Sequence, residues 1–134
     1  MAINEYELVL VTRPELTEDV VQHIKSSITG FIAEQNGQVL VFESWGQRKL
    51  AYPIQKSKYG NYYFVDFVAE GSTPALLERH IKLRLGNIIR YLTVKLDGDI
   101  KDLGSEELLE ARKEAATKRS QKTIERLNAA LVSN

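Results

Sequence analysis

The sequence contains no cysteine, only three prolines and no excess of charge of either sign, since 18 Lys and Arg are matched by 18 Asp and Glu. The absence of cysteine excludes disulfide bonds, thiolate zinc sites and a cysteine nucleophile. The balanced charge excludes an overall positive field that would attract nucleic acid. Any contact with RNA is therefore expected to come from local cationic clusters or from a surface shared with a partner.

Long apolar runs are also missing from the sequence. No segment has the length and hydropathy of a membrane span, and the first residues lack the basic start and the apolar run of a signal peptide. We therefore expect no membrane partner, and a protein that stays in the cytoplasm, where it is made. Its 134 residues suffice for one domain with a single core plus an appendage.

Patterns typical of catalysis or metal binding are not found. The histidines are His23 and His80, both in segments with helical spacing and neither in a metal-ligand arrangement. The glycines are scattered, so neither a phosphate-binding loop nor a dinucleotide fingerprint is present. We expect no catalytic residue, no metal, no cofactor and no small-molecule substrate.

Alternation of apolar and polar residues predicts four strands, over residues 6–12, 38–50, 61–68 and 88–96. Successive side chains of a strand point to opposite faces of the sheet. One face is expected to carry Tyr6, Leu8, Leu10, Tyr63, Val65 and Phe67. The opposite face is expected to carry Glu7, Val9, Val11, Tyr62, Phe64 and Asp66.

Two segments between these strands have the spacing of apolar residues that is typical of helices. The first begins after Thr17, whose hydroxyl suits an N-cap. The second is predicted to begin with Thr73 as N-cap and Pro74 in its first turn. In the second strand, Gly46 predicts a bulge and Pro53 is expected to mark the end.

The order strand, helix, strand, strand, helix, strand predicts an α+β protein with the ferredoxin-like βαββαβ fold. In that fold both helices cover one face of a four-stranded antiparallel sheet, and the first and third strands are central. We assign residues 1–98 to this domain and residues 99–134 to a charged C-terminal extension. Its composition of Glu, Lys, Arg and Ala indicates a surface helix or a partly disordered tail, and a solvated helix without a partner stays open.

If both helices cover one face, the other face is left open. An uncovered apolar patch lowers solubility, so its residues favour a binding surface. We interpret Val9, Val11, Tyr62 and Phe64 as contacts to a protein partner. Two alternatives stay open: the C-terminal segment folds back over the patch, or the strand parity is shifted by one residue and these side chains belong to the core.

Two other functions are compatible with this architecture. Aromatic residues on an open four-stranded sheet are typical of the RNA recognition motif, an autonomous module for single-stranded RNA, and residues 63–67 resemble part of its longer motif. Small acyl-phosphate hydrolases share the fold but hold phosphate in a glycine-rich loop after the first strand. Here that stretch has Arg13 and no glycine, and fold alone does not decide function.

A characteristic run, Gly-Gln-Arg-Lys-Leu-Ala-Tyr-Pro-Ile, occupies residues 46–54 and is followed by Lys56. Arg13-Pro14 ends the first predicted strand, and Ile-Ile-Arg occupies residues 88–90 in the last. At matching positions over roughly residues 5–97, the sequence resembles the bacterial small-subunit ribosomal protein S6 family.

The resemblance implies a structural component of the small ribosomal subunit that binds the central domain of 16S rRNA jointly with ribosomal protein S18. It implies a cytoplasmic ribosome and leaves an organellar ribosome open. Carried over to matching positions, it implies RNA contacts by five cations, which neutralise phosphates, and by one tyrosine, which stacks or hydrogen-bonds. These residues are Arg13, Arg48, Lys49, Tyr52, Lys56 and Arg90.

Overall fold

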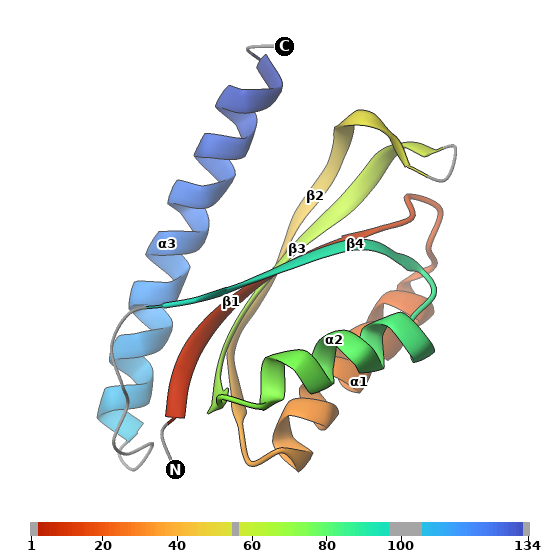
Figure 1. Ribbon diagram of the computed structural model, residues 1–134. Helices are drawn as coiled ribbons and strands as arrows, with labels where there is room; N and C mark the ends of the chain where they lie inside the picture. Colours follow the sequence, from red (N-terminus) through yellow and green to blue (C-terminus); the bar gives the residue numbers. More distant parts are fainter. Residues whose placement is uncertain (1–2, 55–56, 97–105, 133–134) are drawn as a thin grey trace.

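The computed structural model describes residues 3–54, 57–96 and 106–132 (Figure 1). Its elements in chain order are β1 (Ile3–Thr12), α1 (Glu18–Glu34), β2 (Gln38–Ile54), β3 (Ser57–Glu70), α2 (Thr73–Arg84), β4 (Ile88–Lys95) and α3 (Glu106–Val132). The four strands form one antiparallel sheet in the order β2-β3-β1-β4. The predicted βαββαβ fold with central first and third strands is confirmed.

The main core lies between the sheet and the helices α1 and α2. α1 buries Ile24, Ile28 and Ile32, and α2 buries Leu77 and Ile81 against the same side of the sheet. Each fully buried side chain of this size contributes roughly 1.5–3 kcal/mol, so both helices are integral to the fold. The sheet presents to them the face predicted from alternation, with Tyr6, Leu8, Leu10, Tyr63, Val65 and Phe67.

The two core helices begin differently. Thr17 caps α1 as predicted, because its hydroxyl accepts a hydrogen bond from the backbone N–H of Val20 at 3.4 Å. The prediction of Thr73 as the cap of α2 is wrong by one residue, since Ser72 occupies the N-cap and Thr73 is the first helical residue. Thr73 is buried at the start of the helix. Pro74 lies in the first turn, as predicted.

β2 and β3 form a long arm at one end of the sheet (Figure 1). The predicted bulge is confirmed, because the pairing shifts between Ser44 and Gly46 and Gly46 has φ of +80°. The prediction that Pro53 ends the second strand is wrong, since β2 continues to Ile54, which pairs with Ser57. β2 is an edge strand, where the missing N–H of a proline removes no hydrogen bond from the sheet interior.

Candidate RNA-binding and protein-docking surfaces

The four residues assigned to a protein partner share the sheet face opposite α1 and α2. In the pairing of β1 with β3, Val9 lies across from Phe64, and Val11 lies across from Tyr62. Residues directly opposite each other in an antiparallel pair point to the same face. The predicted parity is therefore confirmed, and the alternative of a one-residue shift is wrong.

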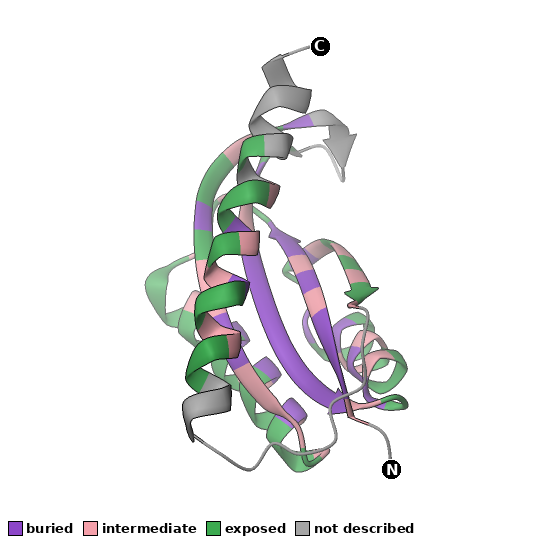
Figure 2. Ribbon diagram, turned by 90° about the vertical axis from the view of Figure 1, so that its left-hand side faces the viewer, coloured by how far each residue is buried: buried purple, intermediate pink, exposed green. Residues whose placement is uncertain are grey.

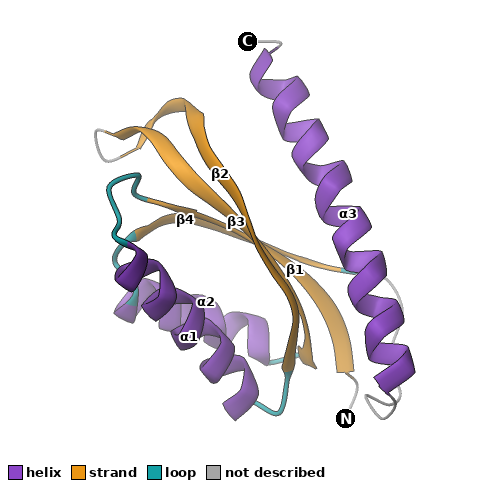
Figure 3. Ribbon diagram, turned by 180° about the vertical axis from the view of Figure 1, so that it is seen from behind, coloured by secondary structure: helices purple, strands orange, loops and turns teal. Residues whose placement is uncertain are grey.

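This second face is not open, because α3 runs across it. α1 and α2 lie on one side of the sheet and α3 lies on the other (Figure 3). Phe64 is fully buried there, and its ring stacks on Trp45 with a centroid distance of 5.4 Å. Val11 is also buried, whereas Val9 and Tyr62 are half-buried. The expectation of an uncovered face is wrong, and the alternative in which the C-terminal segment folds back over it is confirmed.

A band of this face beside α3 stays exposed on the edge strand β4. Leu92 lies across from Val9 and Val94 lies across from Glu7, so both point to the second face. Their exposed fractions are 63% and 47%. Figure 2 shows buried strands behind α3 and an outward side of α3 that is mostly exposed. The cover that α3 provides is therefore partial.

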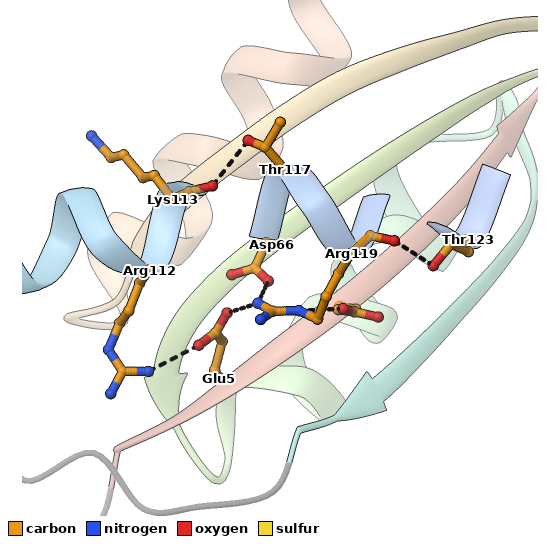
Figure 4. Close-up of polar contacts among 8 residues, drawn as sticks. Glu5, Asp66, Arg112, Lys113, Thr117, Arg119 and Thr123 are labelled. Carbon is orange, nitrogen blue, oxygen red and sulfur yellow. Dashed lines mark hydrogen bonds and ion pairs between the residues drawn. The ribbon is translucent and has the colours of Figure 1, made fainter. Parts of the chain in front are cut away.

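Arg119 of α3 enters a cluster of three carboxylates on the second face. Its Nε lies 2.9 Å from Oε1 of Glu7, and its Nη2 lies 3.0 Å from Oδ2 of Asp66 and also contacts Glu5. Two helical turns earlier, Nη1 of Arg112 lies 3.0 Å from the other oxygen of Glu5. Figure 4 shows the two guanidinium groups of α3 meeting the carboxylates of the sheet. Glu5 therefore joins both arginines to β1.

The electrostatics of this cluster favour a proton on Asp66. Burial, followed by hydrogen bonding with Glu5 and repulsion from its charge, raises the pKa of Asp66 from 3.8 to about 8, against the opposing effect of Arg119. Burial alone would lower the pKa of Arg119, but its hydrogen bond to Asp66 and the charges of Glu5 and Asp66 outweigh burial and raise it. Arg119 therefore stays charged while Asp66 holds a proton near neutral pH.

Ser120 provides a second polar anchor for α3. The indole Nε1 of Trp45 donates a hydrogen bond to Oγ of Ser120 at 2.8 Å. The same hydroxyl donates to Oε2 of Glu43 at 2.8 Å. Both partners lie on β2, so this chain of hydrogen bonds fixes α3 to the edge of the sheet opposite β4.

The cations assigned to RNA come from separate strands and gather at the end of the sheet where β1 ends and β4 begins. Arg13 directly follows β1, and Arg90 of β4 pairs across from Val11. Arg48 of β2 lies near the hydroxyl of Tyr62, as Arg90 does. Burial raises the pKa of Tyr62, and the charges of Arg90 and Arg48 oppose that rise. Both guanidinium groups therefore lie near one phenol.

Of the other three RNA candidates, only Lys49 is described in full. Lys49 is exposed on β2 across from Tyr59, close to Arg48 in the arm. The backbone of Tyr52 belongs to β2, but its side chain lies outside the described residues, as does the whole of Lys56. The structure thus brings Arg13, Arg48 and Arg90 to one end of the sheet, with Lys49 beside them.

Sequence reasoning missed the acidic cluster and its two arginines. Alternation had placed Glu7 and Asp66 on the second face, where two carboxylates on neighbouring strands predict a cationic partner. Arg112 and Arg119 are seven residues apart, which places them on the same side of a helix. That spacing was the available signal for the covering role of α3.

The described residues contain no group of His, Cys, Asp and Glu that is arranged to hold a metal ion. Over the same residues, no helix combines the length and hydropathy needed to span a membrane. The carboxylates of Glu5, Glu7 and Asp66 instead contact the guanidinium groups of α3.

Comparison with known proteins identifies the class of this chain. The profile of the family described as ribosomal protein S6 matches residues 5–95. Small ribosomal subunit protein bS6 of Geobacter metallireducens is 38% identical over 95 residues, which cover 71% of this chain and 80% of that protein. The bS6 protein of Gloeothece citriformis is 40% identical over 96 residues, covering 72% of this chain and 54% of that protein. The bS6 protein of Nitratidesulfovibrio vulgaris is 32% identical over 101 residues, covering 75% and 99%.

A solved structure supports the fold. The crystal structure of 30S ribosomal protein S6 from Thermotoga maritima matches with a TM-score of 0.64 at 24% identity, covering 84% of this chain and 97% of that one. Fold and relatives together define a structural protein of the bacterial small ribosomal subunit, not an enzyme. Within that class, the chain belongs to the ribosomal protein S6 family.

Proposed function

We propose that this chain binds the central domain of 16S rRNA jointly with ribosomal protein S18, on the cytoplasmic ribosome of a bacterium. The relatives are bacterial proteins, and an organellar ribosome finds no support among them. The observation that carries the proposal is the group of cations Arg13, Arg48, Lys49 and Arg90 at one end of a chain without net charge. Tyr52 and Lys56 belong to the same proposal.

A local cationic group on a neutral protein accounts for joint binding. Each phosphate contact contributes through counterion release, and a few such contacts give weak binding at physiological salt. Contacts from a protein partner add to these without requiring an overall positive charge. Arg48 and Arg90 both lie near Tyr62, so the surface proposed for RNA adjoins the residues proposed for the protein partner.

The proposal is tested by replacing two adjacent cations of the arm. Arg48→Ala together with Lys49→Ala should weaken binding to a central-domain rRNA fragment in the presence of S18. The slope of log affinity against log salt should fall by about one unit for each lost phosphate contact. Binding is measured by filter retention over a salt series.

The matched control removes two exposed cations of α2, by Lys82→Ala together with Arg84→Ala. This variant has the same net charge as the first and should keep the slope of the unaltered chain. Equal slopes for the two double variants would remove Arg48 and Lys49 from the RNA surface, since net charge alone would then explain the effect.

For the protein partner, we propose contacts at Val9, Val11, Tyr62 and Phe64. Support comes from their common sheet face and from the exposed apolar band of β4 that adjoins it. With α3 in place, only Val9 and Tyr62 of the four are partly accessible. We also propose residues 1–98 as the family domain and 99–134 as an extension, which the profile match to residues 5–95 supports.

The two other functions weighed from the sequence gain no support. An autonomous RNA recognition motif needs accessible aromatic rings on the second face, and Phe64 is fully buried beneath α3. An acyl-phosphate hydrolase needs a phosphate-binding loop after β1, and the relatives of this chain are ribosomal proteins.

A further inference from the structure

A cleft opens between the first half of α1 and the arm formed by β2 and β3. Its volume is about 340 Å³, which lies within the range of small-ligand sites. Because α1 and α3 lie on opposite faces of the sheet, the cleft and α3 are on opposite sides (Figure 3). The polar side chains that line the cleft are Glu18, Gln22, Lys25, Ser44, Asn61 and Tyr63.

The floor of the cleft is aromatic. The ring centroids of Phe42 and Tyr63 lie 6.1 Å apart, and both side chains line the cleft and the apolar space beneath it. The ammonium group of Lys25 lies 5.6 Å from the centroid of the Phe42 ring. An apolar floor with a polar rim suits a flat ligand with polar groups along its edge, because the ligand buries its faces while its edge forms hydrogen bonds.

The rim of the cleft combines a hydrogen-bond acceptor with donors. Nε2 of Gln22 donates to Oε1 of Glu18 at 3.2 Å, and a carboxylate accepts several such bonds. Burial raises the pKa of Tyr63, and the charge of Glu18 raises it further. The phenol of Tyr63 therefore keeps its proton. The rim thus presents a carboxylate that accepts, beside a hydroxyl and the ammonium group of Lys25, which donate.

The same sheet face continues along the arm with Tyr59 and Lys49. Strand alternation places Tyr59 on the face of Asn61 and Tyr63. Lys49 lies directly across from Tyr59, so it points to that face as well. Both side chains are exposed, Tyr59 by 45%. An exposed cation and an exposed ring beside a cleft suit a nucleotide strand, because the cation contacts phosphate and the ring stacks on a base.

The cations proposed for RNA adjoin the cleft. Asn61, which lines it, lies between Thr12 of β1 and Gln47 of β2. Arg13 directly follows Thr12 in the chain, and Lys49 comes two residues after Gln47. A nucleotide whose phosphates are held by these cations would therefore lie beside the cleft.

We propose that this cleft binds an unpaired base of the rRNA, and that guanine fits it best. The inference rests on the proposed function, because it names the part of the RNA that this face recognises. Guanine is the RNA base with two adjacent donors, its ring N–H and its amino group, and a carboxylate accepts such a pair on its two oxygens. Glu18 supplies that carboxylate, and Tyr63 and Lys25 donate to the carbonyl oxygen of the base. The ring of the base packs on Phe42.

The unaltered full chain is tested with two nucleotides that differ in one group. Guanosine monophosphate and inosine monophosphate have the same ring system and phosphate, but inosine lacks the amino group. The side-chain amide signals of Gln22 and Asn61 in isotope-labelled protein report on the cleft by nuclear magnetic resonance. Guanosine monophosphate should shift both signals and bind about tenfold more tightly than inosine monophosphate, because a hydrogen bond to a charged group is lost with the amino group.

Two variants of α1 separate the cleft from general electrostatics. Glu18→Ala and Asp19→Ala each remove one exposed carboxylate from the first turn of the helix, and of the two only Glu18 lines the cleft. Charge alone would make either variant bind an anionic nucleotide more tightly. Glu18→Ala should instead bind guanosine monophosphate about tenfold more weakly than the unaltered chain. Asp19→Ala should bind it at least as tightly as the unaltered chain does.

Equal affinities of the two nucleotides for the unaltered chain would overturn the inference, as would equal effects of Glu18→Ala and Asp19→Ala. Signals of Gln22 and Asn61 that respond to S18 but not to either nucleotide would overturn it too, because the cleft would then hold a side chain of a protein. These outcomes leave the proposed function standing, since filter retention measures that separately. Failure of the unaltered chain to bind the rRNA fragment with S18 would instead refute the proposed function and, with it, the source of the base.

Discussion

A Cβ atom on Gly37 would lie 2.7 Å from the carbonyl oxygen of Val68 and 2.9 Å from Cβ of Ala69. Gly37 lies in the turn between α1 and β2, where the chain passes against the end of β3. The preceding residue, Asn36, takes the left-handed conformation of this turn, with φ of 63°. Gly37 is therefore required for its lack of a side chain and not for its backbone angles.

Gly37→Ala should lower the free energy of unfolding by about 1–3 kcal/mol, because neighbouring backbone has to move to accommodate the methyl group. Gly30→Ala is the matched control, since a Cβ there meets nothing within 4 Å. In the helix α1, this second change should raise stability by roughly 0.5–1 kcal/mol. Urea unfolding followed by circular dichroism measures both, and effects of the same sign would contradict the assigned packing.

Phe64→Ala should cost about 3–5 kcal/mol, because the ring is fully buried and stacked on Trp45. Leu92→Ala on the same sheet face should stay within about 0.5 kcal/mol, since Leu92 is largely exposed. Thermal unfolding of the two variants separates the covered part of the face from the exposed band on β4. A stability of Phe64→Ala close to that of Leu92→Ala would show that α3 leaves the face in solution.

Ser120→Ala should lower stability by about 1–3 kcal/mol, because the buried indole N–H of Trp45 and the carboxylate of Glu43 both lose their partner. The tryptophan emission of this variant should change at the same time. Gln121→Ala, at the exposed neighbouring position, is the control and should alter neither. Emission spectra that are identical in the two variants would place Trp45 away from α3.

Asp66 gives a dependence of stability on pH that is opposite in sign to that of an ordinary ion-paired carboxylate. Its pKa is raised from 3.8 to about 8, so the folded protein holds this proton more tightly than the unfolded chain does. The resulting stabilisation is complete below the unfolded value and is lost as the pH rises through the folded value. Deprotonation then leaves a buried negative charge on Asp66 beside the carboxylate of Glu5.

Asp66→Asn should therefore reduce the loss of stability between about pH 5 and about pH 9, because the amide stays neutral over the whole interval. Urea midpoints at constant ionic strength, measured for both proteins across that range, give the comparison. Parallel curves for the two proteins would mean that Asp66 does not titrate there. The unaltered chain should also release α3 more readily at the alkaline end, which Trp45 emission reports.

Most of the βαββαβ domain was predictable, because its elements bury continuous apolar faces. Alternation along β1 and β3 placed Val9 and Phe64 on the correct side of the sheet, and helical spacing located α1 with its cap at Thr17. Local signals failed where tertiary packing overrides them. Thr73 is a buried helical residue, and Ser72 occupies the N-cap of α2 instead. Pro53 is tolerated inside β2 because that strand lies at the edge of the sheet.

The covering role of α3 was not predictable from apolar periodicity. Among the described side chains of α3, the buried ones are Ala116 and Ser120, which are too small to mark an apolar stripe in the sequence. The described contacts of α3 with the sheet include the ion pairs of Arg119 with Glu5, Glu7 and Asp66, a long-range charge match that no local window contains. The accessibility of Phe64, on which its assignment to a protein partner was based, was not predictable either, because it depends on where α3 lies.

Arg119 and Glu5 are separated by 114 residues, so the contact between them closes a loop through nearly the whole chain. A ribosome makes proteins from the N-terminus, and the four strands and two core helices therefore leave the ribosome before α3 does. During that interval the acidic and aromatic face of the nascent protein is accessible to other molecules. A binding partner that is present early meets this face without competition from the chain's own last helix.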